Sequence, residues 1–241
     1  MKFVDTHIHC VQNTDDGSQS LSDSIQMLKM EYEQSVRDVF CTVHSEMITD
    51  MNDDAFALNQ MENLIDAFQN ETGNSMKLNL LTEIHINLDS FEDCFIGMKK
   101  IVPWFRPING AYYMFAFDYE ETAENMVEIC KRLIERGIKP VISHAERYTY
   151  ILEAIDRLRE IGCIIQVNIG SFVRGGFLAF TDIALQMLDN KQIDILGTDA
   201  HRMKWRPPVI MDGYNIIKDL TTEEYLYDIC YGNAAKIFRL M

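Results

Sequence analysis

The 241-residue chain contains little of what interrupts or cross-links a fold. It has 5 prolines and 12 glycines, and its six cysteines are scattered without a Cys-x-x-Cys pair. This cysteine usage argues against a zinc ribbon or a redox dithiol and suits a reducing cytosol. No apolar run approaches the length of a membrane span, and no signal peptide precedes the first strand-like run. We therefore expect a cytoplasmic protein with no membrane insertion.

Positive charge is scarce as well. Lys and Arg number 22 against 37 Asp and Glu, which gives a formal net charge of −15. A field of that sign repels polyanions, so nucleic acid and anionic membranes are poor partners. A small anionic substrate would need cations in its pocket, and bound metal would supply them.

Hydrophobic residues, in contrast, make up 47% of the chain, which is enough for a large buried core. Apolar runs that read as strands alternate with segments of helical periodicity. The expected strands cover residues 2–9, 36–43, 77–86, 111–117, 138–143, 163–168 and 192–197. Helices are expected from Leu21 to Tyr32, from Phe56 to Phe68, and at about 121–136, 150–161, 177–190 and 209–240.

Strands separated by helical crossovers pair in parallel through right-handed βαβ units. No break in composition marks a linker, so we expect a single domain over residues 1–241. Seven such units within one domain favour closure into an α/β barrel over an open sheet.

The stretch Asp5-Thr6-His7-Ile8-His9 ends the first expected strand. Side chains alternate between the two faces of a strand, so Asp5, His7 and His9 are expected to share one face. Imidazoles are common metal ligands, and a carboxylate often orients them. A solvent-exposed histidine pair at a strand end is the alternative, and the pentapeptide alone does not decide between the two.

Polar residues recur at the carboxyl ends of the other expected strands. His44 follows the second strand, Glu83 lies near the end of the third, and His144 follows the fifth. Asp199 and His201 follow the seventh. In closed α/β barrels these strand ends converge on one mouth, where active sites are built. Five of the six histidines would meet there, which predicts a site for several metal ions.

Two arginines come soon after expected ligands. Arg147 stands three residues beyond His144, and Arg206 lies in a proline-stiffened loop after His201. The arginine fork matches phosphate oxygens, so in an acidic protein we interpret the pair as oxyanion-binding. For either arginine alone, a solvated charge is the alternative. Asp15-Asp16-Gly17 in the first loop offers another carboxylate, with an ordinary Asp-Gly turn as the alternative.

With these motifs the chain resembles the polymerase-and-histidinol-phosphatase (PHP) superfamily of metal-dependent phosphoesterases. The resemblance is to its bacterial protein-tyrosine phosphatases, which act on the tyrosine kinases that regulate capsular and exopolysaccharide synthesis. It implies a distorted seven-stranded (β/α) TIM-like barrel of the PHP type. The stretches that carry it are residues 5–9, 15–17, His44, 82–84, 140–148, 198–201 and 206–208.

The resemblance also implies roles for particular residues. The implied metal ligands form three groups: His7, His9, Glu83 and Asp199; Glu83 with His144; and Asp16, His44 and His201. Two or three divalent ions are therefore expected, with manganese favoured over iron or zinc. Arg147, Arg206 and Asp199 are the expected catalytic residues, and the arginines are expected to hold the phosphate.

One position on the fourth strand departs from the family pattern. Ala116 stands where the family has a carboxylate, and alanine cannot bind a metal. Asp118 shares its strand face but lies roughly 6–7 Å farther along. His85 shares the strand face of Glu83. Either Asp118 or His85 is a candidate replacement ligand.

We expect a metal-dependent phosphomonoester hydrolase in which a metal-activated hydroxide attacks phosphotyrosine on a kinase tail. A thiol mechanism is disfavoured because no cysteine stands in a Cys-x5-Arg setting. The alternatives are a small-molecule phosphatase of the histidinol-phosphatase kind, an amidohydrolase-like enzyme that cleaves C–N bonds, and a regulatory barrel weakened by Ala116.

Overall fold

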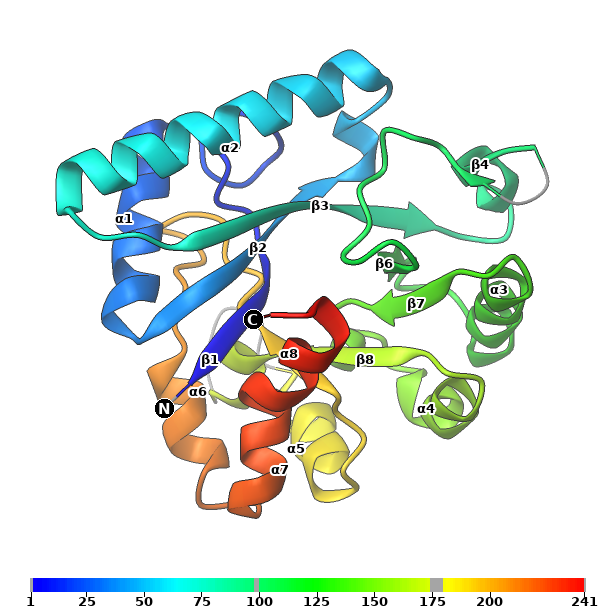
Figure 1. The fold of residues 1–241 in the computed structure, drawn as a ribbon. Coiled ribbons are helices and arrows are strands. Elements are labelled where there is room, and N and C mark those ends of the chain that lie inside the picture. Colours follow the sequence, from blue (N-terminus) through cyan, green and yellow to red (C-terminus); the bar gives the residue numbers. More distant parts are fainter. Residues whose placement is uncertain (1, 98–99, 174–179, 241) are drawn as a thin grey trace.

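The computed structural model describes residues 2–97, 100–173 and 180–240. Its main sheet contains seven strands that pair in parallel in chain order (Figure 1). They are β1 (Phe3–Ile8), β2 (Val36–His44), β3 (Lys77–Ile86), β6 (Tyr112–Phe117), β7 (Lys139–Ile142), β8 (Ile164–Asn168) and β9 (Ile195–Gly197). Each lies where the hydrophobic pattern predicted a strand.

The first and last strands come together at the carboxyl end of the sheet. Ile8 and Ala200 form an isolated parallel bridge, and the His9 amide donates to the Ala200 carbonyl at 2.8 Å. The Thr6 hydroxyl donates to the Leu196 carbonyl at 2.9 Å. These contacts make the sheet a nearly closed, distorted barrel and confirm the predicted fold class.

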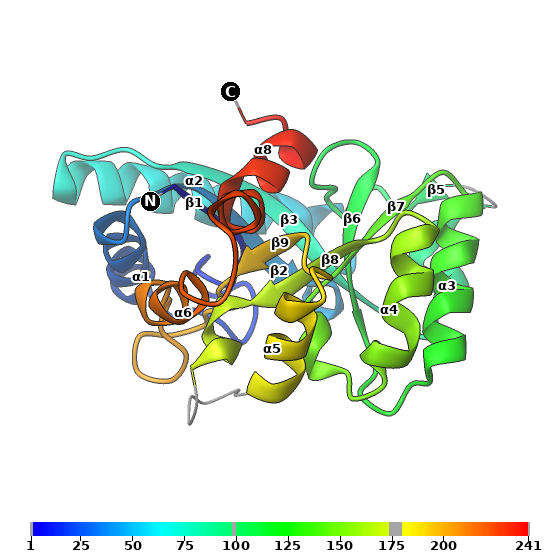
Figure 2. The ribbon, with the colours of Figure 1, turned by 90° about the horizontal axis from the view of Figure 1, so that it is seen from below.

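Helices surround the barrel (Figures 1 and 2). They are α1 (Leu21–Glu33), α2 (Met51–Thr72), α3 (Ala123–Glu135), α4 (Ile151–Glu160), α5 (Thr181–Asp189), α6 (Met211–Ile217), α7 (Glu223–Tyr227) and α8 (Asn233–Phe238). Part of the helix expected at 177–190 falls on residues 177–179, outside the described residues. A small antiparallel hairpin, β4 (Phe95–Ile96) and β5 (Lys100–Ile101), stands apart from the barrel sheet.

Local sequence signals account for several helix ends. The side chains of Ser20, Asp50 and Thr122 accept hydrogen bonds from first-turn amides of α1, α2 and α3. They satisfy amide donors that a helix start leaves unpaired. Gly73 ends α2 with a φ of 70°, a conformation that favours glycine. Among the described residues, no helix is long and apolar enough to cross a membrane.

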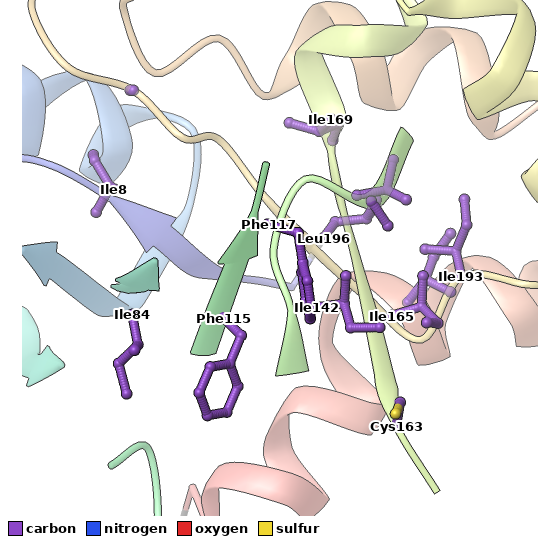
Figure 3. Packing of buried hydrophobic residues seen from close by; sticks show 14 of the residues in the cluster. Ile8, Ile84, Phe115, Phe117, Ile142, Cys163, Ile165, Ile169, Ile193 and Leu196 are labelled. Atoms are coloured by element: carbon purple, nitrogen blue, oxygen red, sulfur yellow. The ribbon is translucent and has the colours of Figure 1, made fainter. Parts of the chain in front are cut away.

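Alternation along the strands produces two apolar layers. Outward side chains such as Ile84, Phe115 and Ile142 pack between the sheet and the helices (Figure 3). Inward side chains fill the amino-terminal half of the barrel, and Ala234 and Phe238 of α8 cover that end. The inward set on the strands consists of Val4, Phe40, Leu81, Met114, Val141 and Ile195. The remaining inward positions, nearer the carboxyl ends, are left for the polar residues.

The β1 strand breaks the expected alternation. Its pairing with β2 shifts between Asp5 and Ile8, where three steps along β1 face two along β2. Asp5 turns toward α1, where it neighbours buried Glu31, and its carboxylate accepts from the Thr198 amide at 2.9 Å. His7 points into the barrel. The prediction that Asp5 and His7 share a face is therefore wrong, because the bulge-like irregularity reverses the pattern between them.

Candidate metal centre

The inward residues at the carboxyl end of β1 and β3 meet in a buried cluster. The Nε2 atoms of His7 and His9 lie 3.0 Å apart. Glu83 Oε2 lies 3.3 Å from His7 Nε2 and 3.4 Å from His9 Nε2. From the loop after β9, Asp199 Oδ1 comes within 3.5 Å of His7 Nε2 and 3.6 Å of His9 Nε2. The structure thus brings together the four residues of the first implied group.

A second set of ligand atoms lies beside the first and closer to solvent. Asp16 Oδ1 is 3.2 Å from His44 Nε2 and 3.5 Å from His201 Nε2. The His9 ring lies between the two histidines, with its centroid 4.4 Å from His44 and 4.2 Å from His201. His44 Nδ1 is also 3.3 Å from Glu83 Oε2. The third implied group is therefore assembled as well, and Glu83 joins it to the first.

The second implied group is smaller. His144 Nε2 lies 2.9 Å from Glu83 Oε1, which also accepts from the Ser143 hydroxyl at 2.7 Å. His144 belongs to none of the sets of three described side chains whose ligand atoms lie within 4.8 Å of one another. Ala116 lines the cavity that His144 also lines, and it contributes no ligand atom.

The two candidate replacements for the missing carboxylate are paired with each other. His85 Nε2 lies 2.7 Å from Asp118 Oδ1, and Asp118 Oδ2 accepts from Asn87 Nδ2 at 2.9 Å. His85 Nδ1 faces Glu46 at 3.5 Å. Both side chains are 40% exposed and contact each other at the rim of the cavity. In this arrangement their ligand atoms are directed at one another and not at His144.

The predicted phosphate-binding arginines lie against the cluster. Arg147 Nη1 is 3.3 Å from Asp199 Oδ2, and Arg206 Nη2 contacts the same oxygen. The other oxygen of Asp199 faces the imidazoles, so this carboxylate lies between the histidines and the guanidinium groups. Both arginines line a cavity of about 340 Å³ together with His44, Glu83 and other residues of the cluster.

Two amides that the sequence interpretation missed hold these groups in place. Gln166 Oε1 accepts from the His144 amide at 2.6 Å and lies 3.3 Å from His7 Nδ1. Its Nε2 donates to Asn168 Oδ1 at 3.0 Å, and Asn168 Nδ2 donates to Asp199 Oδ2 at 3.0 Å. The contact of Gln166 with Nδ1 leaves Nε2 of His7 free to face the carboxylates. Their alternate positions in the otherwise apolar Ile164–Asn168 strand are the signal that could have found them.

Asp15, the neighbour of predicted Asp16, has a positioning role of the same kind. Its Oδ2 lies 2.7 Å from His9 Nδ1, and the side chain is 1% exposed, whereas that of Asp16 is 61% exposed. The loop reaches His9 because position 17 is glycine. A Cβ there would lie 2.3 Å from the His9 carbonyl oxygen. The Asp-Gly pair is thus a close approach to the site as well as a turn.

Backbone strain is also found at this end of the barrel. His144 has a φ of 33° and Asp199 a φ of 52°, values that side chains with a Cβ rarely adopt. Such strain persists where surrounding contacts enforce it, and it is common at functional sites. The Gln166 contact enforces it at His144, and the Asp199 amide donates to the His7 carbonyl at 2.6 Å.

The charges in the cluster perturb one another. Burial lowers the pKa of His7, but the carboxylates of Glu83 and Asp199 outweigh burial and raise it to about 9. For His44, burial is again outweighed, mainly by the neighbouring carboxylates of Asp16 and Glu83, and its pKa rises to about 11. The pKa of Glu83 falls well below its ordinary value, because the imidazoles around it outweigh its burial. The carboxylates therefore favour added positive charge within the cluster.

The donor set fits divalent cations. Imidazole nitrogens and carboxylate oxygens converge from separate elements, a mixture that suits manganese, iron or zinc. Glu83 Oε2 is buried and has no hydrogen-bond partner among the described residues, although three imidazole nitrogens lie within 3.4 Å. An unpartnered buried carboxylate oxygen is destabilising, and a cation would satisfy it.

The chain is similar to known proteins along almost its whole length. The family profile described as "Capsular polysaccharide synthesis, CpsB/CapC" matches residues 3–239. Tyrosine-protein phosphatase CpsB of Streptococcus pneumoniae is 25% identical over 244 residues, covering 98% of each chain. The putative tyrosine-protein phosphatase CapC of Staphylococcus aureus is 26% identical over 222 residues, covering 88% of this chain and 82% of its own.

The fold has a solved counterpart. The similar structure is described as "Crystal structures of YwqE from Bacillus subtilis and CpsB from Streptococcus pneumoniae, unique metal-dependent tyrosine phosphatases". The TM-score is 0.81 at 21% identity, and the match covers 99% of this chain and 94% of the other. Together these matches confirm the resemblance inferred from the motifs.

Proposed function

The chain belongs to the CpsB/CapC family, and on that premise we propose that it is a metal-dependent protein-tyrosine phosphatase. Its substrate would be phosphotyrosine in a protein, namely the tail of a bacterial tyrosine kinase that regulates capsular or exopolysaccharide synthesis. The names of its relatives in two genera support the reaction class. The family description supports the biological setting.

One observation carries the proposal: Asp199 lies between a cluster of metal-ligand side chains and two guanidinium groups. Its Oδ1 faces His7 and His9, and its Oδ2 faces Arg147 and Arg206. The proposed cation ligands and the arginines proposed to bind phosphate are thus adjacent at one cavity of about 340 Å³. Phosphoryl transfer requires both, because negative charge develops on several oxygens at once.

The residues that would hold the cations form three neighbouring groups. They are His7, His9, Glu83 and Asp199; Glu83 and His144; and Asp16, His44 and His201. Bound there, divalent cations would lower the pKa of water and polarise the phosphoryl group. We propose two or three ions, with manganese favoured and iron or zinc as alternatives.

The protein's own contribution is to position charge. Arg147 and Arg206 would bind the phosphoryl oxygens, since the planar fork matches two of them at once. Asp199 holds both guanidinium groups in place, and Asn168 holds Asp199. Asp15 fixes the ring of His9, as Gln166 does for His7. The phosphate would therefore meet donors that are already oriented, which is the main source of electrostatic catalysis.

The rival hydrolase classes explain the cavity less well. Amidohydrolase-like sites commonly use a carboxylated lysine or late histidines, and none of the described residues that line this cavity is a lysine. The two arginines that line the cavity, Arg147 and Arg206, would also have no role in C–N bond cleavage. A small phosphate substrate or a weakened, regulatory barrel is compatible with the same side chains, so a reaction assay must separate these from the proposal.

The test uses the full-length protein, stripped of metal with a chelator and reloaded with manganese, iron, zinc or magnesium. We expect hydrolysis of p-nitrophenyl phosphate and of a phosphotyrosine peptide, strict dependence on added metal, and no turnover of an amide panel. A histidinol phosphate assay run in parallel reports the small-molecule alternative. No phosphatase activity from protein with measured full metal content would refute the proposal.

A variant at the phosphate clamp links that activity to this site. Arg206→Lys keeps the positive charge but loses the two-pronged hydrogen bonding. We expect inorganic phosphate to inhibit this variant roughly tenfold more weakly than the wild type. Arg157→Lys on α4 is the matched control, because this arginine is exposed and paired with Glu124. Phosphate should inhibit it as strongly as it inhibits the wild type.

We further propose that the protein acts in the cytoplasm as one catalytic domain spanning residues 1–241. The six cysteines are all free and buried, which suits a reducing compartment. The proposed substrate, a tyrosine kinase tail, fits the same compartment.

A further inference from the structure

Two large aromatic side chains stand exposed at the rim of the catalytic cavity. Tyr119 is 53% exposed and Trp205 is 42% exposed, and both line the cavity that contains the metal-ligand side chains. Tyr119 follows β6, and Trp205 lies in the loop between β9 and α6. Since β7 and β8 separate β6 from β9 in the sheet, the two rings come from distant parts of the barrel rim.

Each ring packs against one of the arginines assigned to the phosphate. The Arg147 guanidinium carbon lies 5.1 Å from the centre of the Tyr119 ring, and that of Arg206 lies 5.7 Å from the Trp205 ring. Both guanidinium groups contact Asp199. A phosphoryl group held by the two arginines would therefore lie at the base of a space with an aromatic ring on each side.

Both rings are supported from behind. The Trp205 ring meets His201 edge-on at 5.8 Å, and its loop is closed by a hydrogen bond from the Arg206 amide to the Arg202 carbonyl at 2.9 Å. Tyr119 lies 6.0 Å from the ring of fully buried Tyr148. Partial burial raises the pKa of the Tyr119 phenol, so the ring remains neutral beside a phosphate. Rings held in this way need little ordering when a ligand arrives.

We propose that Tyr119 and Trp205 form an aromatic clamp that receives the ring of an aryl phosphate and makes the site selective for phosphotyrosine over alkyl phosphates. The inference rests on the proposed phosphatase function and adds the residues that choose the substrate. The ester substituent of a phosphate held at the arginines must leave through the mouth, where these two rings stand. Aromatic pairs attract one another beyond the area they bury, whereas a short alkyl arm makes no such contact.

The test compares two inert probes, phenylphosphonate and methylphosphonate, as inhibitors of p-nitrophenyl phosphate hydrolysis by the manganese-loaded protein. Both present the same anion to the arginines, and only one carries a ring. We expect the wild type to prefer phenylphosphonate. Tyr119→Ala and Trp205→Ala should each reduce that preference by about threefold to tenfold, and the double variant should reduce it further.

Two further measurements separate recognition of the substrate ring from support of the arginines. The inhibition constant of inorganic phosphate should stay within about twofold of wild type in the alanine variants. Tyr119→Phe and Trp205→Phe, which keep a ring, should restore most of the preference for phenylphosphonate. Tyr227→Ala removes an aromatic that is 51% exposed on α7, and it serves as the matched control.

The possible outcomes distinguish the clamp from the reaction. Loss of the phenylphosphonate preference with unchanged phosphate inhibition supports the clamp. Equal weakening of both phosphonates and of phosphate would mean that the rings only support the arginines. All three inhibition constants unchanged would mean that the rings have no role in binding. Either result overturns the clamp alone. A metal-loaded wild type that hydrolyses no phosphomonoester overturns the proposed function, and the clamp with it.

Discussion

The two ends of the barrel differ in the side chains that the same strands direct inward. At the amino-terminal end the inward side chains are apolar and fully enclosed, and α8 covers them. Farther along the same strands the inward side chains are imidazoles, carboxylates and small residues. On six of the seven strands, or directly after them, the pairs are Val4 and His7, Phe40 and His44, Leu81 and Glu83, Met114 and Ala116, Val141 and Ser143, and Ile195 and Gly197.

This difference separates stability from chemistry within one sheet. Apolar burial at the closed end stabilises the fold without regard to charge. At the mouth, buried carboxylates and strained backbone at His144 and Asp199 act against folding until cations or protons offset the charge. Gly197 shows how tightly the mouth is built, because a Cβ there would lie 2.8 Å from the Cβ of His7. Substitutions at the two ends should therefore affect different measurements.

The largest effect is expected for Glu83→Gln at the mouth. This carboxylate contacts His7, His9, His44 and His144, so its loss removes a ligand from two of the three implied cation groups and a contact of His44 from the third. We expect metal-dependent kcat/KM to fall by roughly a thousandfold or more, while the metal-free protein keeps its thermal stability within a few degrees.

Kinetics with manganese, elemental analysis and thermal unfolding of the metal-free protein check this prediction. Glu160→Gln, an exposed position at the end of α4, is the control and should behave as wild type. Activity within tenfold of wild type for Glu83→Gln would show that the cluster is not the catalytic centre.

The opposite pattern is expected for Met114→Ala at the closed end. Met114 is fully buried among the inward apolar side chains, and removing it leaves a cavity. The free energy of unfolding should fall by about 3 kcal/mol, with kcat/KM nearly unchanged at temperatures where the variant is folded. Denaturant unfolding measures the free energy of unfolding.

Leu220→Ala is the control, because this side chain is 54% exposed, and it should change stability by no more than about 0.5 kcal/mol. A Met114 variant that loses activity but not stability would contradict the division between the two ends.

Most of this architecture could be predicted from the sequence because its signal is periodic. Alternating strands and helices determine the parallel barrel, and polar residues at strand ends determine the mouth. The reversal between Val4 and His7 could not be predicted, because it depends on a register shift with β2 that no local pattern encodes. The pairing of His85 with Asp118 also depends on the sheet register, which places His85 opposite Ala116.

The missed positioning residues show a second limit of the sequence signal. Asp15 and Gln166 act through the far nitrogen of a histidine, so their role exists only once the loops and strands are assembled. A polar residue in a strand indicates that something buried needs a partner, but it does not say which residue. Asp15 was further masked by Asp16, since adjacent carboxylates in a turn look interchangeable in a sequence.

A pH-dependent effect is expected at Glu146, which anchors the loop that carries His144 and Arg147. One of its oxygens accepts from the Ser171 hydroxyl at 2.7 Å and from the Asn168 amide at 3.2 Å. Burial raises the pKa of Glu146 to about 7 from an ordinary value of 4.5. Stability from the neutral carboxyl is therefore fully present below pH 4.5 and is lost as the pH rises through about 7.

Glu146→Gln removes this titration and keeps an oxygen that can accept both hydrogen bonds. The variant should match the wild type near pH 4 and exceed it by about 3 kcal/mol at pH 8. Denaturant unfolding across that range measures the difference. A stability difference that stays constant with pH would show that Glu146 does not titrate in the folded protein.

The smallest effect is expected for a substitution at Ala116, two residues after Met114 on β6. The same strand then supplies one test position at each end of the barrel. Ala116 lines the cavity beside His144, whose implied cation group contains only one other side chain, Glu83. Ala116→Glu adds a carboxylate there, and we expect metal affinity to rise by about tenfold, with little change in the metal-free stability. Ala116→Gln, of equal length and without charge, is the matched control, and calorimetric titration with manganese gives affinity and stoichiometry for both. If the glutamate variant binds metal no better than the glutamine variant, the inward position of β6 is not part of a cation site. The contrast between the two ends would then depend on β1, β2, β3 and the loops after β7 and β9 alone.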